Sequence, residues 1–261
     1  MSAFYIEQTR DEVVVTGIDA RKFLHSQLAN DIASLAIGES RYSLLLEPAG
    51  KISSLVRVRC IAEDNFILDT ESGFAEIAAT RLSRFKIRIK CEIVTGSRNY
   101  FLFRNLNLEQ HAKLVTSYGA VTAWRGAKLE VDAVAFDPEQ ISDIRQGSIG
   151  DYELARVLAV WPMMGTDMTS DSIPSETGLT DVAVSFTKGC YPGQELVERM
   201  DSRGATAPRS LRLIRAEVGA QVGAPVMLDG QEIGIYTSVC QEFALALIKR
   251  SADSSSIQIG S

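Results

Sequence analysis

The sequence predicts an α+β fold that ends in a small antiparallel β-barrel, and three observations support this class. Apolar segments with a period of two alternate with two helical patterns in the N-terminal part of the chain. Short strand candidates joined by glycine-containing connections follow residue 205. The 261 residues are 46% hydrophobic and 23% charged, a balance typical of an ordered protein with a substantial core.

The N-terminal segment is expected to form a strand and then a helix. Residues 11–17 have the composition of a short strand, and Asp19 is placed to cap the helix that follows. His25 is expected to be a satisfied or exposed helix histidine. Four apolar residues recur at helical spacing and extend this helix to about residue 35: Leu24, Leu28, Ile32 and Leu35.

A β-hairpin and a second helix are expected next. Two strand candidates, 41–47 and 52–61, flank Pro48-Ala49-Gly50-Lys51, which has the residue types of a hairpin turn. Residues 65–70 continue the sheet, and residues 73–84 are predicted to be helical.

Residues 84–90 alternate cations with apolar residues, which predicts a strand with one basic face. Such a row is ordinarily a solvated sheet face, and a polyanion site is the alternative. The net charge of −6 opposes the approach of phosphates, so we do not expect direct, tight nucleic-acid binding. The four cations are Arg84, Lys86, Arg88 and Lys90.

The middle of the chain is less regular. Residues 100–104 and 131–136 are expected to be extended, and residues 151–160 to form a helix that ends before Trp161-Pro162. Residues 165–178 are rich in Gly, Thr, Ser, Asp and Pro and predict a loop, a kind of segment that commonly carries functional residues.

The domain organisation follows from these patterns. Residues 1–204 are expected to form one α+β region, with a first part over about 1–97 and a central part over 98–204 that can be intertwined. Residues 205–250 are expected to form the barrel, and the Ser-rich residues 251–261 a flexible tail. The barrel strands are predicted over 211–216, 224–228, 232–240 and 243–248.

Composition also restricts location and metal content. No apolar run is long enough for a membrane span, and the first ten residues lack the features of a signal or transit peptide. The four cysteines contain no CxxC pair, and the two histidines are far apart. We therefore expect a cytoplasmic protein with no membrane association and no permanently bound metal.

The segment Lys188-Gly189-Cys190-Tyr191-Pro192-Gly193-Gln194-Glu195 is the most informative stretch of the chain. A thiolate is the reactive form of cysteine, and a neighbouring cation such as Lys188 favours it. A helix is expected to start after Gly193, so Cys190 would lie near the positive end of that helix. The alternative is a cysteine that packs as a small hydrophobe in a tight turn.

This segment resembles the hallmark Lys-Gly-Cys-Tyr-x-Gly-Gln-Glu of the folate-binding YgfZ-type branch of the aminomethyltransferase (glycine-cleavage T-protein) superfamily. Further similar stretches lie on both sides of it. They are Thr16-Gly17-Ile18-Asp19-Ala20, Leu46-Glu47-Pro48-Ala49-Gly50-Lys51-Ile52, Ile173-Pro174-Ser175-Glu176, Arg203-Gly204, Arg209-Ser210-Leu211 and Gly234-Ile235-Tyr236-Thr237-Ser238.

The resemblance implies a ring of α+β portions and the barrel around a central cavity. Tetrahydrofolate would bind in that cavity, with Cys190 facing it or nearby. It also implies a link to iron–sulfur cluster assembly or repair and to tRNA modification. The implied partners are a folate and iron–sulfur client enzymes or assembly proteins.

Two departures from the family pattern bear on activity. Ser53-Ser54 stand where T-proteins carry an acidic pair, and a serine has no usable acidity near neutral pH, so ordinary aminomethyltransferase activity is not expected. Leu158 stands where many relatives carry a glutamate that contacts the pterin. A replacement acceptor would have to come from Glu176, Asp167 or Glu195.

The leading hypothesis is therefore an accessory protein in which Cys190 attacks, ligates iron transiently or bridges a sulfur, while Lys188 favours its thiolate. The turn itself is expected to depend on Gly189, Tyr191, Gly193 and Gln194. Gln194 and Glu195 would orient it or hold a ligand.

The candidate folate contacts have structural alternatives. The arginines would attract an anionic folate tail or pair with neighbouring acids, and the aromatic residues, Tyr191 among them, would stack on the pterin or pack in the core. The candidate contacts are Glu195, Arg199, Arg203, Glu176 and Phe186.

Two other functions stay open at this point. One is a folate-dependent aminomethyl or methyl transferase, or a demethylase-like enzyme, that uses a different acid. The other is an RNA-modification partner that draws on the basic row at 84–90.

Overall fold

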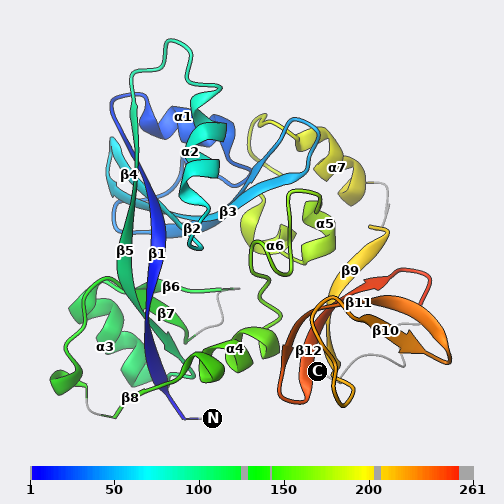
Figure 1. The fold of residues 1–261 in the computed structure, drawn as a ribbon. Coiled ribbons are helices and arrows are strands. Elements are labelled where there is room, and N and C mark those ends of the chain that lie inside the picture. The colour runs from blue at the N-terminus through cyan, green and yellow to red at the C-terminus, as the bar shows by residue number, and fades with distance from the viewer. Residues whose placement is uncertain (1, 125–128, 142, 203–206, 253–261) are drawn as a thin grey trace.

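The computed structural model describes residues 2–124, 129–141, 143–202 and 207–252. Within these ranges the chain forms two β-sheets with helices between and around them (Figure 1). The larger sheet contains β1 (Phe4–Thr16), β2 (Ser40–Leu46), β3 (Ile52–Ala62), β4 (Asn65–Thr70), β5 (Glu92–Arg104), β6 (Val121–Thr122), β7 (Val131–Ala133) and β8 (Arg145–Gln146).

The strands of this sheet follow the order β2-β3-β4-β1-β5-β7-β6, and β8 pairs in parallel with β1. Strands β1 and β5 pair antiparallel along their full length, from Phe4 opposite Arg104 to Thr16 opposite Glu92. The prediction of a short strand over 11–17 therefore covers only the second half of β1. Its first half alternates polar and apolar residues less regularly, which weakens the sequence signal.

The expected hairpin is confirmed: β2 and β3 pair antiparallel across the turn at residues 48–51. The strand over 65–70 and the helix over 73–84 are also confirmed, as β4 and as α2 (Ala75–Ser83). Almost every residue of β3 from Ile52 to Cys60 is buried, because the sheet is covered on both faces at this point.

The helix after Asp19 is shorter than its apolar spacing predicts. Helix α1 (Ala20–Gln27) ends where Leu28 becomes extended and forms an isolated bridge with Leu45 of β2. Ile32 and Leu35 are buried in the irregular segment that follows. The spacing of Ile32 and Leu35 therefore reflects burial against the sheet and does not indicate a helix.

The predicted basic strand over 84–90 is wrong. Arg84 is the C-cap of α2, Arg88 has a positive φ of 61°, and β5 starts only at Glu92. A left-handed residue interrupts extended backbone, so the four cations do not form one strand face. The segment is instead the loop above α2 in Figure 1.

The central part of the chain contains most of the helices of the described residues. Residues 165–178, predicted as a loop, include the one-turn helix α5. Extended backbone near residue 131 is confirmed by the short strand β7. The helices are α3 (Leu108–Tyr118), α4 (Ile149–Leu158), α5 (Pro174–Thr177), α6 (Thr180–Ala183) and α7 (Gln194–Ser202), together with a 3-10 turn over Pro138–Gln140.

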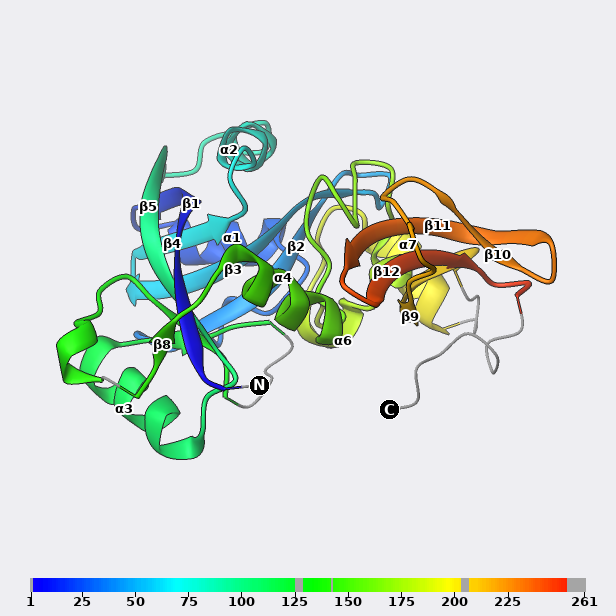
Figure 2. The ribbon, with the colours of Figure 1, turned by 60° about the horizontal axis from the view of Figure 1, so that its bottom comes forward.

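The C-terminal strands agree with their predicted positions, but in the described residues they form a curled open sheet and not a closed barrel. The sheet order is β10-β11-β12-β9, and all three pairings are antiparallel. Val157 of α4 packs against Leu211 and Leu245, which joins this sheet to the central helices (Figure 2). Its strands are β9 (Arg209–Arg215), β10 (Pro225–Leu228), β11 (Gln231–Cys240) and β12 (Phe243–Lys249).

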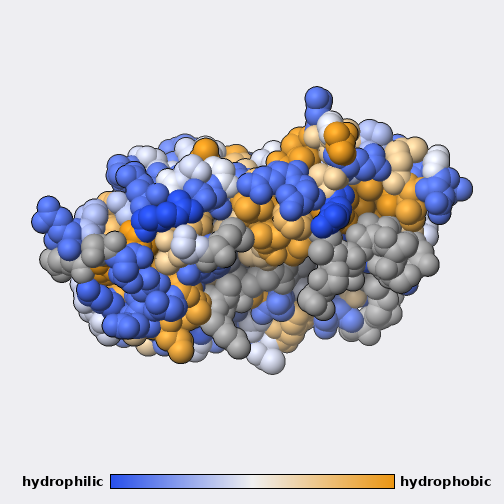
Figure 3. All heavy atoms as spheres, turned by 90° about the horizontal axis from the view of Figure 1, so that it is seen from below, coloured by the Kyte–Doolittle hydropathy of each residue, from blue (hydrophilic) through white to orange (hydrophobic). Residues whose placement is uncertain are grey.

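The predicted tail lies largely outside the described residues, which end at residue 252. The boundary expected at residue 204 also lies outside them. On the face seen from below, hydrophilic and hydrophobic side chains are interspersed (Figure 3). Among the described residues, no helix combines the length and apolarity that crossing a bilayer requires.

Candidate functional site

The cysteine segment forms an exposed turn just before helix α7. Cys190 is exposed, whereas Cys60 and Cys91 are buried. The main-chain N–H of Tyr191 donates a hydrogen bond to Oε1 of Gln194, the first residue of α7, over 3.2 Å. Gln194 thus joins the turn to the helix, and the thiol is presented to solvent close to the helix start.

Lys188 is fixed beside this turn by main-chain oxygens of a distant segment. Its Nζ donates to the carbonyl oxygen of Leu28 over 2.6 Å and also to that of His25, so it is tied to the C-terminal end of α1. The same Nζ lies 4.9 Å from the centre of the Tyr191 ring. Both carbonyls and the ring attract a cation, so the ammonium group stays near the turn.

The Lys188 ammonium group is also electrostatically perturbed. Desolvation lowers the pKa of Lys188 to about 8, while Asp31 and Cys190 act in the opposite direction. The structure therefore brings Cys190 and Lys188 within electrostatic reach of each other.

Gly193 allows the turn to approach the β2–β3 hairpin. Its φ is +85°, and a Cβ atom there would lie 2.7 Å from the carbonyl oxygen of Glu47 and 3.0 Å from Cα of Gly50. Gly50 has a φ of +82°, and a Cβ atom there would lie 2.6 Å from Cβ of Leu196. The two glycines together let α7 pack directly on the hairpin turn.

Gly189 has a different environment. No heavy atom lies within 4 Å of the position that its Cβ would occupy. Packing of the described chain therefore does not explain a glycine at this position. The space next to Cys190 is open on this side.

The remaining candidates on α7 form an exposed ion pair. Nη2 of Arg199 donates to Oε1 of Glu195 one turn away, and both side chains face solvent. This is the structural alternative to a folate-tail contact. Arg203 lies outside the described residues.

Glu176 is buried, and its Oε1 accepts a hydrogen bond from Nε of Arg209 over 3.1 Å. This contact joins α5 to the first strand of the C-terminal sheet. Asp167 is similarly engaged, because its carboxylate accepts hydrogen bonds from Arg156 and Thr237. Neither carboxylate is free to replace the acceptor that is lost at Leu158.

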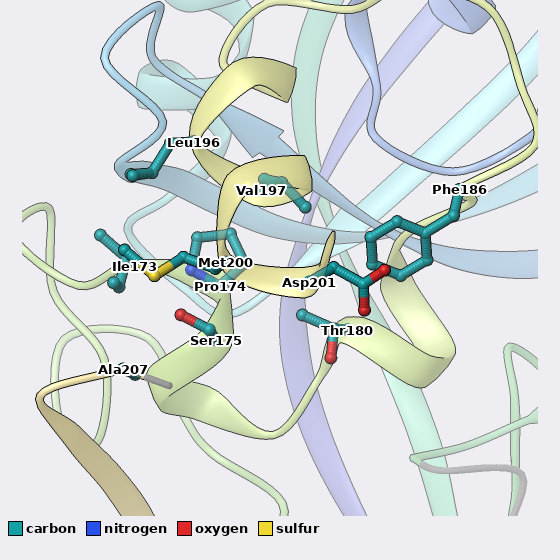
Figure 4. A pocket seen from close by; sticks show the side chains of 10 residues that line it. All are labelled: Ile173, Pro174, Ser175, Thr180, Phe186, Leu196, Val197, Met200, Asp201 and Ala207. Atoms are coloured by element: carbon teal, nitrogen blue, oxygen red, sulfur yellow. The ribbon is translucent and has the colours of Figure 1, made fainter. Parts of the chain in front are cut away.

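Phe186 lines a cavity of about 200 Å³ beside helix α7 (Figure 4). The Phe186 ring lies next to the Asp201 carboxylate, and Ile173 and Met200 lie on the other side. Most of the lining is apolar, and Cys190 is not among the described lining residues. The Cys190 thiol therefore does not contribute to this cavity.

Tyr191 packs in the hydrophobic core and does not present an exposed ring on which a ligand could stack. Its side chain is buried in the same hydrophobic cluster as Leu46 and Val197. Ser53 and Ser54 on β3 are also buried, and Oγ of Ser54 has no partner in the described part of the chain. The hairpin thus offers no acid at this position.

A second cavity, called the central cavity below, lies where side chains of the larger sheet, of α4 and of the segment around Trp161 meet. Its free volume is about 20 Å³, which is room for about one water molecule. The lining residues are Gln8, Arg10, Tyr42, Leu55, Glu71, Arg104, Trp124, Asp132, Tyr152, Arg156, Trp161 and Met163.

An Arg–Asp network contributes Arg104 and Asp132 to the lining of this central cavity. Arg57 bonds to Asp69 over 3.0 Å and to Asp132 over 2.7 Å, and Arg104 bonds to Asp132 over 2.7 Å. Burial alone would raise the pKa of both aspartates, but the guanidinium groups hold each pKa below its ordinary value. The network therefore stays charged although it is buried.

Two polar atoms at this cavity keep unused hydrogen-bonding capacity. Oε1 of Gln8 and Nε of Arg104 are buried and have no partner among the described residues. Burial raises the pKa of Glu71, the Arg10 guanidinium acts in the opposite direction, and the Glu71 carboxylate accepts a hydrogen bond from Oγ1 of Thr70 over 3.4 Å. Buried polar groups are normally satisfied, so the two unpartnered atoms call for an explanation.

The central cavity was missed at the level of sequence. A usable signal was nevertheless present, because single charged residues interrupt otherwise apolar strands. Such a residue is rarely buried without a partner or a function. The three clearest cases are Arg57, Asp69 and Asp132.

The described residues contain no group of three or more His, Cys, Asp or Glu side chains that could hold a metal ion. His25 is engaged locally, since its Nδ1 accepts from the main-chain N–H groups of Ile32 and Ala33. Burial and Lys188 lower the pKa of His25. It is placed to support the segment after α1.

Comparisons of the sequence and of the fold find similar proteins. Residues 7–104 match the family model described as the GCVT N-terminal domain. The chain is 24% identical over 246 residues to an uncharacterized protein of Haemophilus influenzae. This alignment covers 90% of this chain and 83% of that protein.

The structure is also similar to the crystal structure of glycine cleavage system aminomethyltransferase T from Bartonella henselae. The TM-score is 0.75 at 19% sequence identity, over 95% of this chain and 78% of that one. The chain therefore has the fold of that aminomethyltransferase, and the match over residues 7–104 supports a place in the same superfamily.

Proposed function

We propose that this protein is a folate-binding accessory protein for iron–sulfur cluster assembly or repair, of the YgfZ-type branch of this superfamily. In this proposal it acts through Cys190 in the cytoplasm and affects tRNA modification indirectly, through an iron–sulfur modification enzyme. The observation that carries the proposal is an exposed Cys190 thiol beside an ammonium group that main-chain oxygens hold in place.

The chemistry assigned to Cys190 needs a thiolate that a large partner can reach. Exposure provides the access, and the fixed charge of Lys188 favours the thiolate. Thiolates are the preferred protein ligands of iron in iron–sulfur clusters. Cys190 would therefore act as a transient ligand to an iron atom of the client's cluster, which is the substrate here.

Tetrahydrofolate is the proposed cofactor, and the chemistry of the central cavity fits it. The larger sheet, α4 and the segment around Trp161 would form the ring around that cavity. Buried groups with open hydrogen-bonding capacity meet aromatic side chains there, as a flat polar ring requires. The present free volume of about 20 Å³ means that lining side chains must move to admit it.

When bound, tetrahydrofolate would supply a carrier of one-carbon units. The chain's own residues would bind and orient the cofactor: Trp124 and Tyr152 present rings, and Arg104 holds a positive charge against both of them, 4.0 Å and 5.2 Å from the ring centres. Ser53 and Ser54 supply no general acid or base, so the proposal contains no aminomethyl transfer.

Complementation tests this function most simply. Cells that lack the protein would receive the wild type, Cys190→Ala or Cys240→Ala, and the activity of an iron–sulfur enzyme would be measured. Cys240 is a matched control because it is another free cysteine, is partly exposed, and has a pKa that burial raises.

We expect Cys240→Ala to restore the enzyme activity and Cys190→Ala to fail, at equal protein level and equal stability in urea. Full rescue by Cys190→Ala would remove the cysteine from the account and refute the proposal.

A further inference from the structure

The cavity of about 200 Å³ beside α7 takes no part in the proposed function. Its walls come from three helices and the adjoining loops. Pro174 and Ser175 belong to α5, Thr180 begins α6, and Met200 and Asp201 belong to α7. The cavity has room for a small organic molecule, and not only for a single water molecule.

Helix α7 turns one face toward this cavity. Leu196, Val197 and Met200 are the apolar residues of this face, and Asp201 is its one carboxylate in the described lining. Asp201 stands in the last turn of the helix, which ends at Ser202. The C-terminal end of a helix carries a partial negative charge, so a carboxylate there is stabilised by a cation.

The described part of the chain supplies no cation for this carboxylate. Arg199, the basic residue in the last turn of α7, pairs with Glu195 instead. The described lining of the cavity contains neither a lysine nor an arginine. The charge of Asp201 is therefore available to a ligand.

An aromatic ring stands beside this charge. Phe186 is 43% exposed, and its ring lies next to the Asp201 carboxylate, whereas Ile173 and Met200 lie on the other side of the cavity (Figure 4). The face of an aromatic ring is partly negative and attracts cations. The cavity therefore has one end that favours a cation and one end that favours an apolar body.

A hydroxyl group of the lining also has unused hydrogen-bonding capacity. Oγ of Ser175 is buried and has no partner among the described residues. A serine hydroxyl accepts hydrogen bonds as well as donating one. A ligand with N–H donors would satisfy it, which agrees with the preference of Asp201 and Phe186 for a cation.

We propose that this cavity binds a small organic ammonium compound. Its ammonium group lies at Asp201 and the Phe186 ring, and its apolar body lies against Ile173, Leu196 and Met200. A carboxylate or phosphate ligand would be repelled by Asp201. The inference goes beyond the proposed function, because neither Cys190 nor a folate takes part in it.

A cavity that accepts any apolar guest is the competing explanation, and two probes separate the two. Cyclohexylmethylamine is an ammonium ion at pH 7, whereas cyclohexylmethanol is neutral and has almost the same shape. Apolar burial alone would bind both equally. Recognition of a cation favours the amine.

The methyl group of Met200 reports binding at the cavity itself. The chain contains six methionines, and Met200 is the one in the described lining. Protein with isotope-labelled methionine methyl groups would be titrated with each probe and followed by NMR, and Met200→Leu identifies the signal. The variants are Asp201→Asn and the control Glu198→Gln, an exposed acid of α7 that contacts Gln194 and is not in the described lining.

We expect the Met200 signal of the wild type to shift saturably with the amine, with a dissociation constant at least about fivefold below that of the alcohol. Glu198→Gln should keep this ratio, and Asp201→Asn should lose it. High salt should lower the ratio in the wild type, because the Asp201 charge is exposed to solvent. Should Asp201→Asn not fold, the ratio of the wild type and its salt dependence decide the question.

Three results would overturn the inference. Equal dissociation constants of the two probes in the wild type, or a preference that Asp201→Asn retains, would leave a cavity that does not recognise a cation. A Met200 signal that responds to neither probe would leave no binding site. None of these results bears on Cys190, whose role is tested separately by complementation.

Discussion

Replacing Gly193 by alanine tests the contact on which the geometry of the cysteine turn depends. At this position φ is +85°, and the added Cβ would lie 2.7 Å from a main-chain oxygen and 3.0 Å from Cα of Gly50. Real Cβ atoms essentially never approach this closely, and both obstacles are backbone. Helix α7 or the hairpin must therefore move.

The expected loss can be estimated from its parts. A left-handed backbone conformation costs a non-glycine residue about 1–2 kcal/mol. Overpacking against a rigid neighbour costs about 1–3 kcal/mol. Lower entropy of the unfolded chain returns about 0.4–1 kcal/mol. We expect Gly193→Ala to lower the free energy of unfolding by about 1–5 kcal/mol.

Gly189→Ala is the matched control within the same segment. Nothing lies within 4 Å of its Cβ position, and its φ is not positive. Its free energy of unfolding should change by no more than about 0.5 kcal/mol. Unfolding in urea, followed by circular dichroism, measures both variants.

Equal unfolding free energies for the two variants would refute the packing of α7 on the hairpin. Gly50→Ala probes the same contact from the other side, because its Cβ would lie 2.6 Å from Cβ of Leu196. It should therefore be destabilised like Gly193→Ala and not like Gly189→Ala.

Two further predictions concern the buried charges. Asp69→Asn should lower the free energy of unfolding by about 3–5 kcal/mol, because it removes a buried carboxylate that pairs with both Arg57 and Arg10. Glu195→Gln, in an exposed ion pair, should lower it by less than about 1 kcal/mol, and equal losses in urea would contradict this reading. Burial raises the pKa of Glu130 from 4.5 to about 7, so the folded state holds a proton that the unfolded state has lost between these pH values. Between pH 4.5 and 7, the free energy of unfolding of the wild type should therefore fall by about 1–2 kcal/mol relative to that of Glu130→Gln. If the two unfolding free energies changed with pH in parallel, the pKa of this carboxyl group would not be perturbed.

The sequence predicted elements well where local pattern and tertiary contact agree. The hairpin at residues 48–51 and helix α2 were predicted because turn residues and apolar spacing are local signals. The start of α7 after Gly193 was predicted for the same reason. In these cases the fold adds no competing interaction.

Errors arose where tertiary contact overrides the local pattern. The spacing of Leu28, Ile32 and Leu35 predicted a helix, but α1 ends where Leu28 bridges to β2. Ile32 and Leu35 are buried although they are not helical. The alternation at 84–90 predicted a strand, but it lies in a loop that contains a left-handed Arg88.

The candidate site was only partly accessible from sequence. The proximity of Lys188 and Cys190 followed from their spacing, but the carbonyl oxygens of His25 and Leu28 that hold Lys188 lie far away in the chain. The partners of Arg57 could not be predicted, because strand pairing brings Asp69 and Asp132 to it from distant segments.

The central claim is that Cys190 is an accessible thiol activated by Lys188, and its alkylation rate measures this directly. Native protein would react with iodoacetamide at pH 7, and mass spectrometry would give the rate at each cysteine in the wild type and in Lys188→Met. We expect Cys190 to react well before Cys60 and Cys91, and to slow several-fold in Lys188→Met. A Cys190 that reacts no faster than the buried cysteines, or at the same rate in both proteins, would contradict the claim.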